Sequence, residues 1–252
     1  MADDIVLNAS GLVMEFKGFR AVDGANLDIA RGSIHALIGP NGAGKSTCFN
    51  LLTKVLTPTS GSIRFEGRDI TGLSPANVSR LGIVRSFQIS AVFGSMTSLE
   101  NVRIALQRRR HGDSWDFWRS DRALASLHDE AMELLSSVGL ADYAGHVADD
   151  LPYGRKRALE IATTLALEPR VLLLDEPMAG MTQEDVARIS ALIRKVAVGR
   201  TVVMVEHNLS VVADLCDRIT VLARGKVLAE GVYSDISRDP RVIEAYIGVP
   251  HA

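Results

Sequence analysis

Disulfides and a surplus of one charge are missing from this 252-residue sequence. It has 2 cysteines, Cys48 and Cys216, too few for a disulfide framework or a four-cysteine metal site. Lys and Arg total 28 while Asp and Glu total 30, and this near-balance argues against a protein whose main task is to coat nucleic acid. With 47% hydrophobic and 23% charged residues, the chain has the composition of a globular protein rather than a disordered one.

Long apolar runs are missing as well. No apolar stretch reaches the roughly 18 residues of a membrane span, and the best runs, Val171–Leu174 and Val202–Val205, have the length of strands. The first residues, Met-Ala-Asp-Asp-Ile, lack the basic and then apolar pattern of a signal peptide. We therefore expect a chain that does not cross a bilayer by itself and stays in the cytosol.

Segments with the patterns of strands and helices alternate along the chain. The apolar run Ile34–Ile38 predicts a buried strand, it ends at a string of turn formers, and Ser46–Leu56 predicts a helix. The spacing is helical from about Ser98 to Leu140, and further on the helical segment Gln183–Val198 lies between two apolar strands. This order predicts an α/β fold, with a mostly parallel sheet covered by helices and a helical block inserted between its β-bearing parts.

A phosphate-binding pattern, G-x-x-x-x-G-K-[ST], lies between the predicted strand and helix. Its glycines let backbone N–H groups approach phosphate oxygens, and the helix N-terminus adds the positive end of a dipole. We expect Lys45 to reach the β- and γ-phosphates of a nucleotide and Ser46 to offer its hydroxyl to Mg²⁺. The pattern comprises Gly39, Pro40, Asn41, Gly42, Ala43, Gly44, Lys45, Ser46 and Thr47.

Two carboxylates and a histidine follow later strands. Asp175 and Glu176 end the apolar run that begins at Val171, and His207 follows the predicted strand Thr201–Val205. Carboxyl ends of parallel strands share one edge of the sheet, so Asp175 is placed to bind Mg²⁺. We expect Glu176 to orient and polarise an attacking water and His207 to reach the γ-phosphate or that water.

In this order and spacing, these motifs resemble the ATP-binding cassette (ABC) ATPases, from about residue 5 to residue 248. The resemblance implies an α/β P-loop NTPase core with a mostly parallel sheet, an N-terminal antiparallel β subdomain and an inserted α-helical subdomain. We expect a single domain, divided at about 1–88 and 161–230 for the nucleotide-binding core with its β subdomain. The helical subdomain with the signature element would cover about 89–160, and a C-terminal helical tail about 231–252.

The resemblance also assigns roles to residues that no pattern singles out. It implies that Phe16 stacks on the adenine of ATP, and that Gln88 senses Mg²⁺ and the attacking water and links the cassette to a membrane partner. The family signature, Leu-Ser-Gly-Gly-Gln, falls on Leu151–Arg155, just ahead of a predicted helix at Lys156–Leu167, and here Pro152 replaces serine and Arg155 replaces glutamine. Thr182 stands where the family usually has Asp or Asn. The signature residues expected to contact the ATP of a second cassette are Leu151, Tyr153, Gly154 and Arg155.

Several phrases are similar to one branch, the ATPases of branched-chain amino acid uptake systems. They are Gly82–Gln88, the signature element with the helix that follows it, Val205–Asn208, and the ending Glu230–Gly248. The resemblance implies an ATPase at the cytoplasmic face of the inner membrane. It also implies a homodimer or heterodimer of cassettes, two integral membrane permease subunits and, indirectly, a periplasmic solute-binding protein, with no nucleic acid. The transported solute and the choice between homodimer and heterodimer stay open.

Other interpretations also stay open at this point. The whole chain also fits a soluble ABC-type ATPase acting on nucleic acid or ribosomes, a small-molecule kinase, or a regulatory nucleotide binder that does not hydrolyse. The apolar residues Val92, Phe93 and Met96 fit either a surface that docks to the permease or the core of the helical block. The basic and aromatic stretch 103–122 fits either contact with lipid head groups or a solvated linker.

Overall fold

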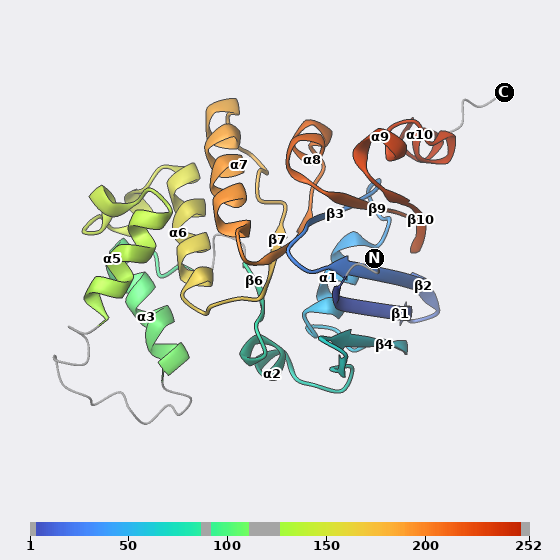
Figure 1. The fold of residues 1–252 in the computed structure, drawn as a ribbon, viewed down its shortest axis with the longest axis horizontal. Helices are drawn as coiled ribbons and strands as arrows, with labels where there is room; N and C mark the ends of the chain where they lie inside the picture. The colour runs from blue at the N-terminus through green and yellow to red at the C-terminus, as the bar shows by residue number, and fades with distance from the viewer. Residues whose placement is uncertain (1–3, 87–91, 111–126, 248–252) are drawn as a thin grey trace.

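The computed structural model describes residues 4–86, 92–110 and 127–247, without the side chains of residues 108–110 and 247 (Figure 1). Its strands are β1 (Ile5–Phe16), β2 (Phe19–Ala30), β3 (Ile34–Ile38), β4 (Ser60–Phe65), β5 (Arg68–Asp69), β6 (Ile83–Arg85), β7 (Val171–Asp175), β8 (Thr201–Val205), β9 (Arg218–Ala223) and β10 (Lys226–Gly231). Its α-helices are α1 (Lys45–Leu52), α2 (Pro75–Arg80), α3 (Ser98–Arg110), α5 (His128–Ser137), α6 (Tyr153–Leu165), α7 (Gln183–Ala197), α8 (Leu209–Leu215), α9 (Tyr233–Ile236) and α10 (Pro240–Ile247), with short 3₁₀ turns at Ala141–Tyr143 and Ala148–Asp150.

Two sheets organise these strands. One has the order β10-β9-β3-β8-β7-β6, with parallel pairing from β9 to β6 and β10 antiparallel at the edge. The other has the order β2-β1-β4-β5 and is antiparallel. The predicted α/β class, with a mostly parallel sheet and an N-terminal antiparallel β unit, is confirmed.

The central strands of the parallel sheet are buried on both faces. Every residue of β3 and β8 is buried, which explains why their sequences are continuous apolar runs rather than alternating ones. Along β8, Val202 and Met204 belong to one core cluster, while Val203 and Val205 belong to another. The second cluster also contains Phe49 of α1 and joins the parallel sheet to the antiparallel one.

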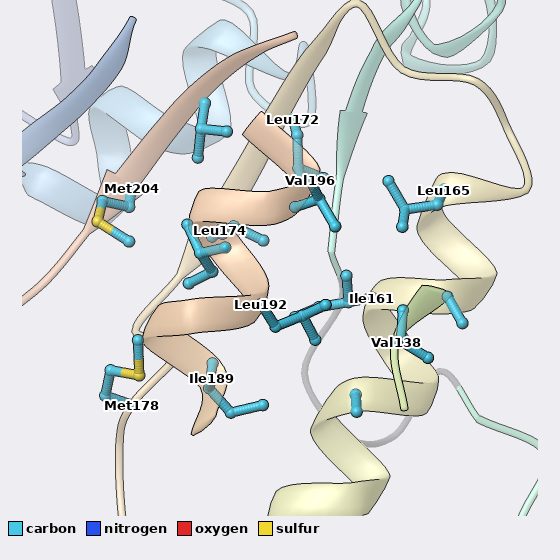
Figure 2. Packing of buried hydrophobic residues seen from close by; sticks show 14 of the residues in the cluster. Val138, Ile161, Leu165, Leu172, Leu174, Met178, Ile189, Leu192, Val196 and Met204 are labelled. Atoms are coloured by element: carbon cyan, nitrogen blue, oxygen red, sulfur yellow. The ribbon is translucent and has the colours of Figure 1, made fainter. Parts of the chain in front are cut away.

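Helices cover the face of the parallel sheet whose residues belong to the first of these core clusters, and further helices lie beyond them. Figure 2 shows Leu172 and Leu174 of β7 beside Ile189 and Leu192 of α7, with Ile161 of α6 beyond them. Helices α3, α5 and α6 contact one another and lie together at one end of the molecule, the end opposite the antiparallel sheet in Figure 1. This arrangement places α6, which contains the last residues of the signature element, between α5 and α7.

Capping side chains fix where two of these helices begin. At α3 the Glu100 N–H donates to Thr97 Oγ1 (3.2 Å), and the Thr97 N–H donates to Glu100 Oε2 (2.8 Å), which is a capping box. At α7 the Asp185 N–H donates to Thr182 Oγ1 (3.3 Å). The hydroxyl of Thr182 therefore has a structural role within this chain as a helix cap.

Two predicted helix boundaries were wrong. Helix α1 ends at Leu52 rather than Leu56, because Thr53 Oγ1 donates back to Phe49 O (2.9 Å) and Lys54 adopts a left-handed φ of 59°. Helix α6 begins at Tyr153 rather than Lys156, because Pro152 acts as its N-cap and Pro152 O accepts the Arg155 N–H (2.9 Å). The last three residues of the signature element, Tyr153–Arg155, are thus part of the helix instead of preceding it.

Across the described ranges, no helix combines the length and the apolar character that a bilayer crossing needs.

Candidate functional site

The loop from Gly39 to Gly44 wraps around the amine of Lys45. Lys45 Nζ donates to Gly39 O (2.7 Å) and to Pro40 O (2.9 Å). Burial lowers the pKa of Lys45, and the charge of Glu176 opposes that shift. The Lys45 amine is therefore bound by two neutral carbonyl groups of the loop, which an anion can replace as acceptors.

Glycine is required at both ends of this loop. A Cβ on Gly39 would lie 2.1 Å from Leu222 O, and a Cβ on Gly44 would lie 2.4 Å from Ala21 O. Both glycines also have positive φ angles, 150° and 99°. The backbone of Leu222 and Ala21 therefore packs against the two ends of the loop and leaves no room for a side chain there.

Helix α1 starts directly after this loop and leaves its N-terminus uncapped. No side chain hydrogen-bonds to the first amides of α1, and the first turn carries no acidic residue. These amides and the helix dipole favour an anion at this point, and Ser46 is exposed there. The loop and the helix start together fit a phosphate chain, as the sequence predicts.

Strands β7 and β8 bring the carboxylates and the histidine to the same edge. Asp175 ends β7, where it pairs with Val205 of β8, and Glu176 and His207 follow these two strands. His207 Nε2 lies 2.8 Å from Glu176 Oε1, and each side chain is 43% exposed. The carboxylate and the imidazole therefore form one solvent-accessible pair, suited to hold a water and accept its proton.

Glu176 has a strained backbone. Its φ of 45° lies in the left-handed region, which a residue other than glycine rarely adopts. The Glu176 N–H donates to Val205 O (3.0 Å), and Glu176 O accepts the Ala179 N–H (3.1 Å). The turn after β7 thus holds Glu176 in a conformation that turns its side chain toward His207.

The expected magnesium ligand Asp175 already has a cationic partner. Arg85 Nη2 donates to Asp175 Oδ2, and Arg85 Nη1 donates to Asn50 Oδ1 of α1 (2.6 Å). Oδ1 of Asp175 and the hydroxyl of Ser46 remain as oxygen donors, the ligand type that Mg²⁺ takes. Within the described ranges, no group of three or more His, Cys, Asp or Glu side chains is arranged to hold a metal ion.

The signature element binds other parts of the same chain. Tyr153 Oη donates to Ala179 O (3.0 Å), in the turn after Glu176. The guanidinium of Arg155 lies 3.9 Å from the centroid of the Tyr143 ring, a cation–π contact. Leu151 is buried, and Gly154 sits against Asp185, whose Oδ1 would lie 2.5 Å from a Cβ at that position. In this conformation Arg155 packs on the helical end of the molecule.

Residues that the sequence did not single out also join the site. Two arginines, Arg85 and Arg157, donate to Asp175, and Glu206 accepts a backbone N–H from the turn after β7. Arg85 and Glu206 could have been found from one signal, because each is a charged residue at the end of an apolar strand on the edge that carries Asp175. Arg157 gives no such signal, because its guanidinium reaches Asp175 O (2.8 Å) from within an amphipathic helix.

Other predicted residues have separate outcomes. Phe16 is 43% exposed at the end of β1, so it is accessible for stacking. Gln88 lies outside the described residues, as do most of the basic and aromatic positions of 103–122. Phe93 is 52% exposed, whereas Val92 packs against the first core cluster, so the two residues do not share one environment. His35, in β3, is a core residue: it is fully buried, and its Nε2 lies 2.8 Å from Thr220 Oγ1.

Comparisons with known proteins agree with this geometry. The ABC transporter family model matches residues 22–179, and a model described as branched-chain amino acid ATP-binding cassette transporter matches residues 226–252. The chain is similar to the high-affinity branched-chain amino acid transport ATP-binding protein BraF of Pseudomonas aeruginosa, at 39% identity over 96% of this chain and 98% of that protein. It is 36% identical to the corresponding protein LivG of Escherichia coli, over 96% of this chain and 98% of LivG.

Solved structures give the same result. A nucleotide-free ATP-binding cassette from an ABC transporter matches with a TM-score of 0.85 and 29% identity, over 97% of this chain and 99% of that one. A dimeric post-hydrolysis cassette bound to ADP and Pi matches with a TM-score of 0.76 and 25% identity, over 90% of this chain and 98% of that one. The family model, which spans more than half of the chain, and the full-length relatives agree with the phosphate loop and the strand-end carboxylates: this chain belongs to the ABC transporter family and is an ATP-binding, ATP-hydrolysing cassette.

Proposed function

We propose that this chain powers the uptake of branched-chain amino acids, or of a related small solute, through a separate membrane permease. The observation that carries the proposal is the 2.8 Å pair of His207 and Glu176, at the sheet edge that carries the metal-binding candidate Asp175. The similarity to BraF and LivG over almost the whole chain, and the branched-chain model over residues 226–252, support the choice of solute class.

Residues 39–47 would hold the phosphates of ATP. Lys45 would exchange the carbonyl groups of Gly39 and Pro40 for the β- and γ-phosphates, since a charged phosphate oxygen is the stronger acceptor. The ring of Phe16 would stack on the adenine. The amides at the start of α1, which no side chain caps, would bind phosphate oxygens.

Glu176 and His207 would then arrange the attack of water. Glu176 accepts a proton from the water, while His207 fixes the carboxylate and the water in line with the γ-phosphate. Mg²⁺, held by Ser46, Asp175 and Gln88 together with the nucleotide, would neutralise phosphate charge. Little covalent chemistry is required of the protein, because positioning and electrostatics carry most of phosphoryl transfer.

A second cassette would complete the site. We propose that Leu151, Tyr153, Gly154 and Arg155 of one copy face the ATP held by residues 39–47 of the other, in a homodimer or heterodimer. Tyr153 and Arg155 would first have to leave Ala179 and Tyr143, so ATP has to offer stronger contacts than these. Helices α3, α5 and α6 would then form the helical subdomain that carries the signature. Hydrolysis removes the γ-phosphate and its contacts, and the two cassettes separate.

The chain would work as a peripheral protein at the cytoplasmic face of the inner membrane. Two permease subunits would dock near Gln88 and the exposed ring of Phe93, and a periplasmic protein would deliver the solute. The near-balanced net charge of −2 supports a protein partner over nucleic acid. Purification from membranes tests this part: co-purified permease subunits support it, whereas hydrolysis that strictly depends on DNA or RNA contradicts it.

The catalytic roles are tested by substitution in the purified transporter. Glu176→Gln is expected to bind ATP normally and to lose hydrolysis, with Glu184→Gln as control because Glu184 is exposed on α7. Lys45→Ala is expected to lose ATP affinity. Lys195→Ala is its control, because Lys195 is exposed on α7. Unchanged turnover in Glu176→Gln, or unchanged binding in Lys45→Ala, would contradict the proposal.

A further inference from the structure

Glu206 is a buried carboxylate that lies between the turns carrying the proposed catalytic pair. It follows β8 directly, and its residue is only 3% exposed. In the described part of the chain, no Lys, Arg or His side chain forms an ion pair with it. Burying a carboxylate is unfavourable unless hydrogen bonds compensate for the lost water, so the role of Glu206 follows from the hydrogen bonds that its two oxygens accept.

The carboxylate accepts backbone N–H groups from both turns. Oε1 accepts the Met178 N–H (3.0 Å), in the turn after β7. Oε2 accepts the His207 N–H (3.0 Å) and the Asn208 N–H (3.3 Å), in the turn after β8. One side chain therefore joins two segments that lie far apart in the sequence, and does so next to Glu176 and at His207 itself.

These contacts act on a strained part of the chain. Glu176, two residues before Met178, has a φ of 45°, and such a conformation persists only where the surroundings fix it. Main-chain hydrogen bonds from Glu176 to Val205 and Ala179 fix one side of the turn, and the hydrogen bond from the Met178 N–H to the Glu206 carboxylate fixes the other. The 2.8 Å separation of Glu176 and His207 depends on both turns keeping their place.

We propose that Glu206 is a positioning residue for ATP hydrolysis: its carboxylate links the amides of Met178 and His207, and so sets Glu176 and His207 at the distance that hydrolysis needs. The proposal rests on the roles proposed above for Glu176 and His207. Glu206 itself would touch neither ATP nor the water.

The arrangement requires a carboxylate rather than any polar group. Glutamine has the same shape but only one acceptor oxygen, and its amide group would meet one of the bound N–H groups donor to donor. A buried donor left without an acceptor is strongly unfavourable, so that turn would shift away. Glu206→Gln therefore separates the two turns while it fills the same space in the core.

The test compares turnover, nucleotide affinity and thermal stability in the purified transporter. Glu206→Gln is expected to lower kcat by about tenfold or more, with the Kd for ATP within about twofold of wild type, because the phosphate loop is untouched. Val202→Ala is the matched control: Val202 is fully buried at the start of the same strand, so its truncation lowers the melting temperature without touching either turn. Amide exchange in the segments around Met178 and His207 should become faster in Glu206→Gln and stay unchanged in Val202→Ala.

A double substitution shows whether Glu206 acts through the pair. In the His207→Ala background, Glu206→Gln is expected to cost little further activity, because the pair that it positions is already broken. The inference is overturned if kcat stays at the wild-type value in Glu206→Gln, if Val202→Ala loses as much kcat at the same loss of stability, or if the two losses multiply. Full activity of His207→Ala alone would instead refute the proposed role of His207, so the two failures are distinguishable.

Discussion

The ion pair between Arg157 and Glu160 lets the effect of one substitution be worked out from the structure. Both residues lie in α6 and are nearly inaccessible, at 5% and 1% exposed. Arg157 Nη1 donates to Glu160 Oε2 (2.5 Å), and Arg157 Nη2 donates to Asp175 O (2.8 Å). Arg157→Met keeps most of the length of the side chain and removes both bonds.

The magnitude follows from two contributions. Burial raises the pKa of Glu160 to about 7, and the guanidinium of Arg157 opposes that rise. Without Arg157 the pKa of Glu160 rises further, so at about pH 8 the Glu160 carboxyl must take up a proton to stay buried. Relative to the wild type, this lowers the free energy of unfolding by about 1–2 kcal/mol, at ~1.4 kcal/mol per pH unit. Losing a charged donor to Asp175 O costs about 1.5–3 kcal/mol. We therefore expect Arg157→Met to destabilise the cassette by about 3 kcal/mol.

Thermal unfolding without nucleotide measures this loss. About 3 kcal/mol corresponds to a fall in melting temperature of about 9 °C for a chain of this size. At about pH 6 the fall should be smaller, because Glu160 is then protonated in both proteins. Arg157→Met combined with Glu160→Leu should recover part of the loss, since no buried carboxyl group then remains. A melting temperature within about 2 °C of wild type at about pH 8 would refute this reasoning.

Three other substitutions test the site and its support. Burial lowers the pKa of His35 to about 4, so the folded protein holds the ring neutral. As the pH falls from about 6.5 to about 4, the wild type should lose up to about 3 kcal/mol of unfolding free energy relative to His35→Gln. Parallel curves of unfolding free energy against pH for the two proteins would contradict this. Arg85→Ala leaves Asp175 without its partner and should cost about 2 kcal/mol, or about 6 °C in the melting temperature, whereas an unchanged temperature would show that the pair contributes nothing. Gly44→Ala places a Cβ 2.4 Å from Ala21 O at a φ of 99°, so ATP affinity should fall by about tenfold or more, and wild-type titration curves would refute the steric argument.

The sequence predicts the parts of this molecule that depend on local patterns. The run Ile34–Ile38 and the glycines after it predict strand β3 and the loop, since the apolar continuity and the turn formers are both readable. Helix ends are harder to predict, as α1 shows: the back-bond of Thr53 and the left-handed Lys54 stop the helix although the apolar pattern continues. Local patterns thus give the elements but not all of their limits.

Contacts between distant segments decide the rest of the site. The positions of Asp175 and His207 were predictable, because Asp175 ends one apolar strand, His207 follows another, and the carboxyl ends of parallel strands share one edge of the sheet. That Asp175 would be paired with Arg85 could not be predicted, because the pairing depends on how β6 lies against β7 and α1. The ring of Tyr143, on which Arg155 packs, likewise becomes visible only after the chain is folded.

A structure of the Glu176→Gln protein with ATP and Mg²⁺ tests the central claim most directly, because the nucleotide should persist in this variant. We expect the triphosphate within residues 39–47 of one copy, with Lys45 on its β- and γ-phosphates and Gly154 of a second cassette facing the γ-phosphate. A triphosphate bound elsewhere, or a closed pair of cassettes in which Gly154 lies far from the γ-phosphate, would contradict the account.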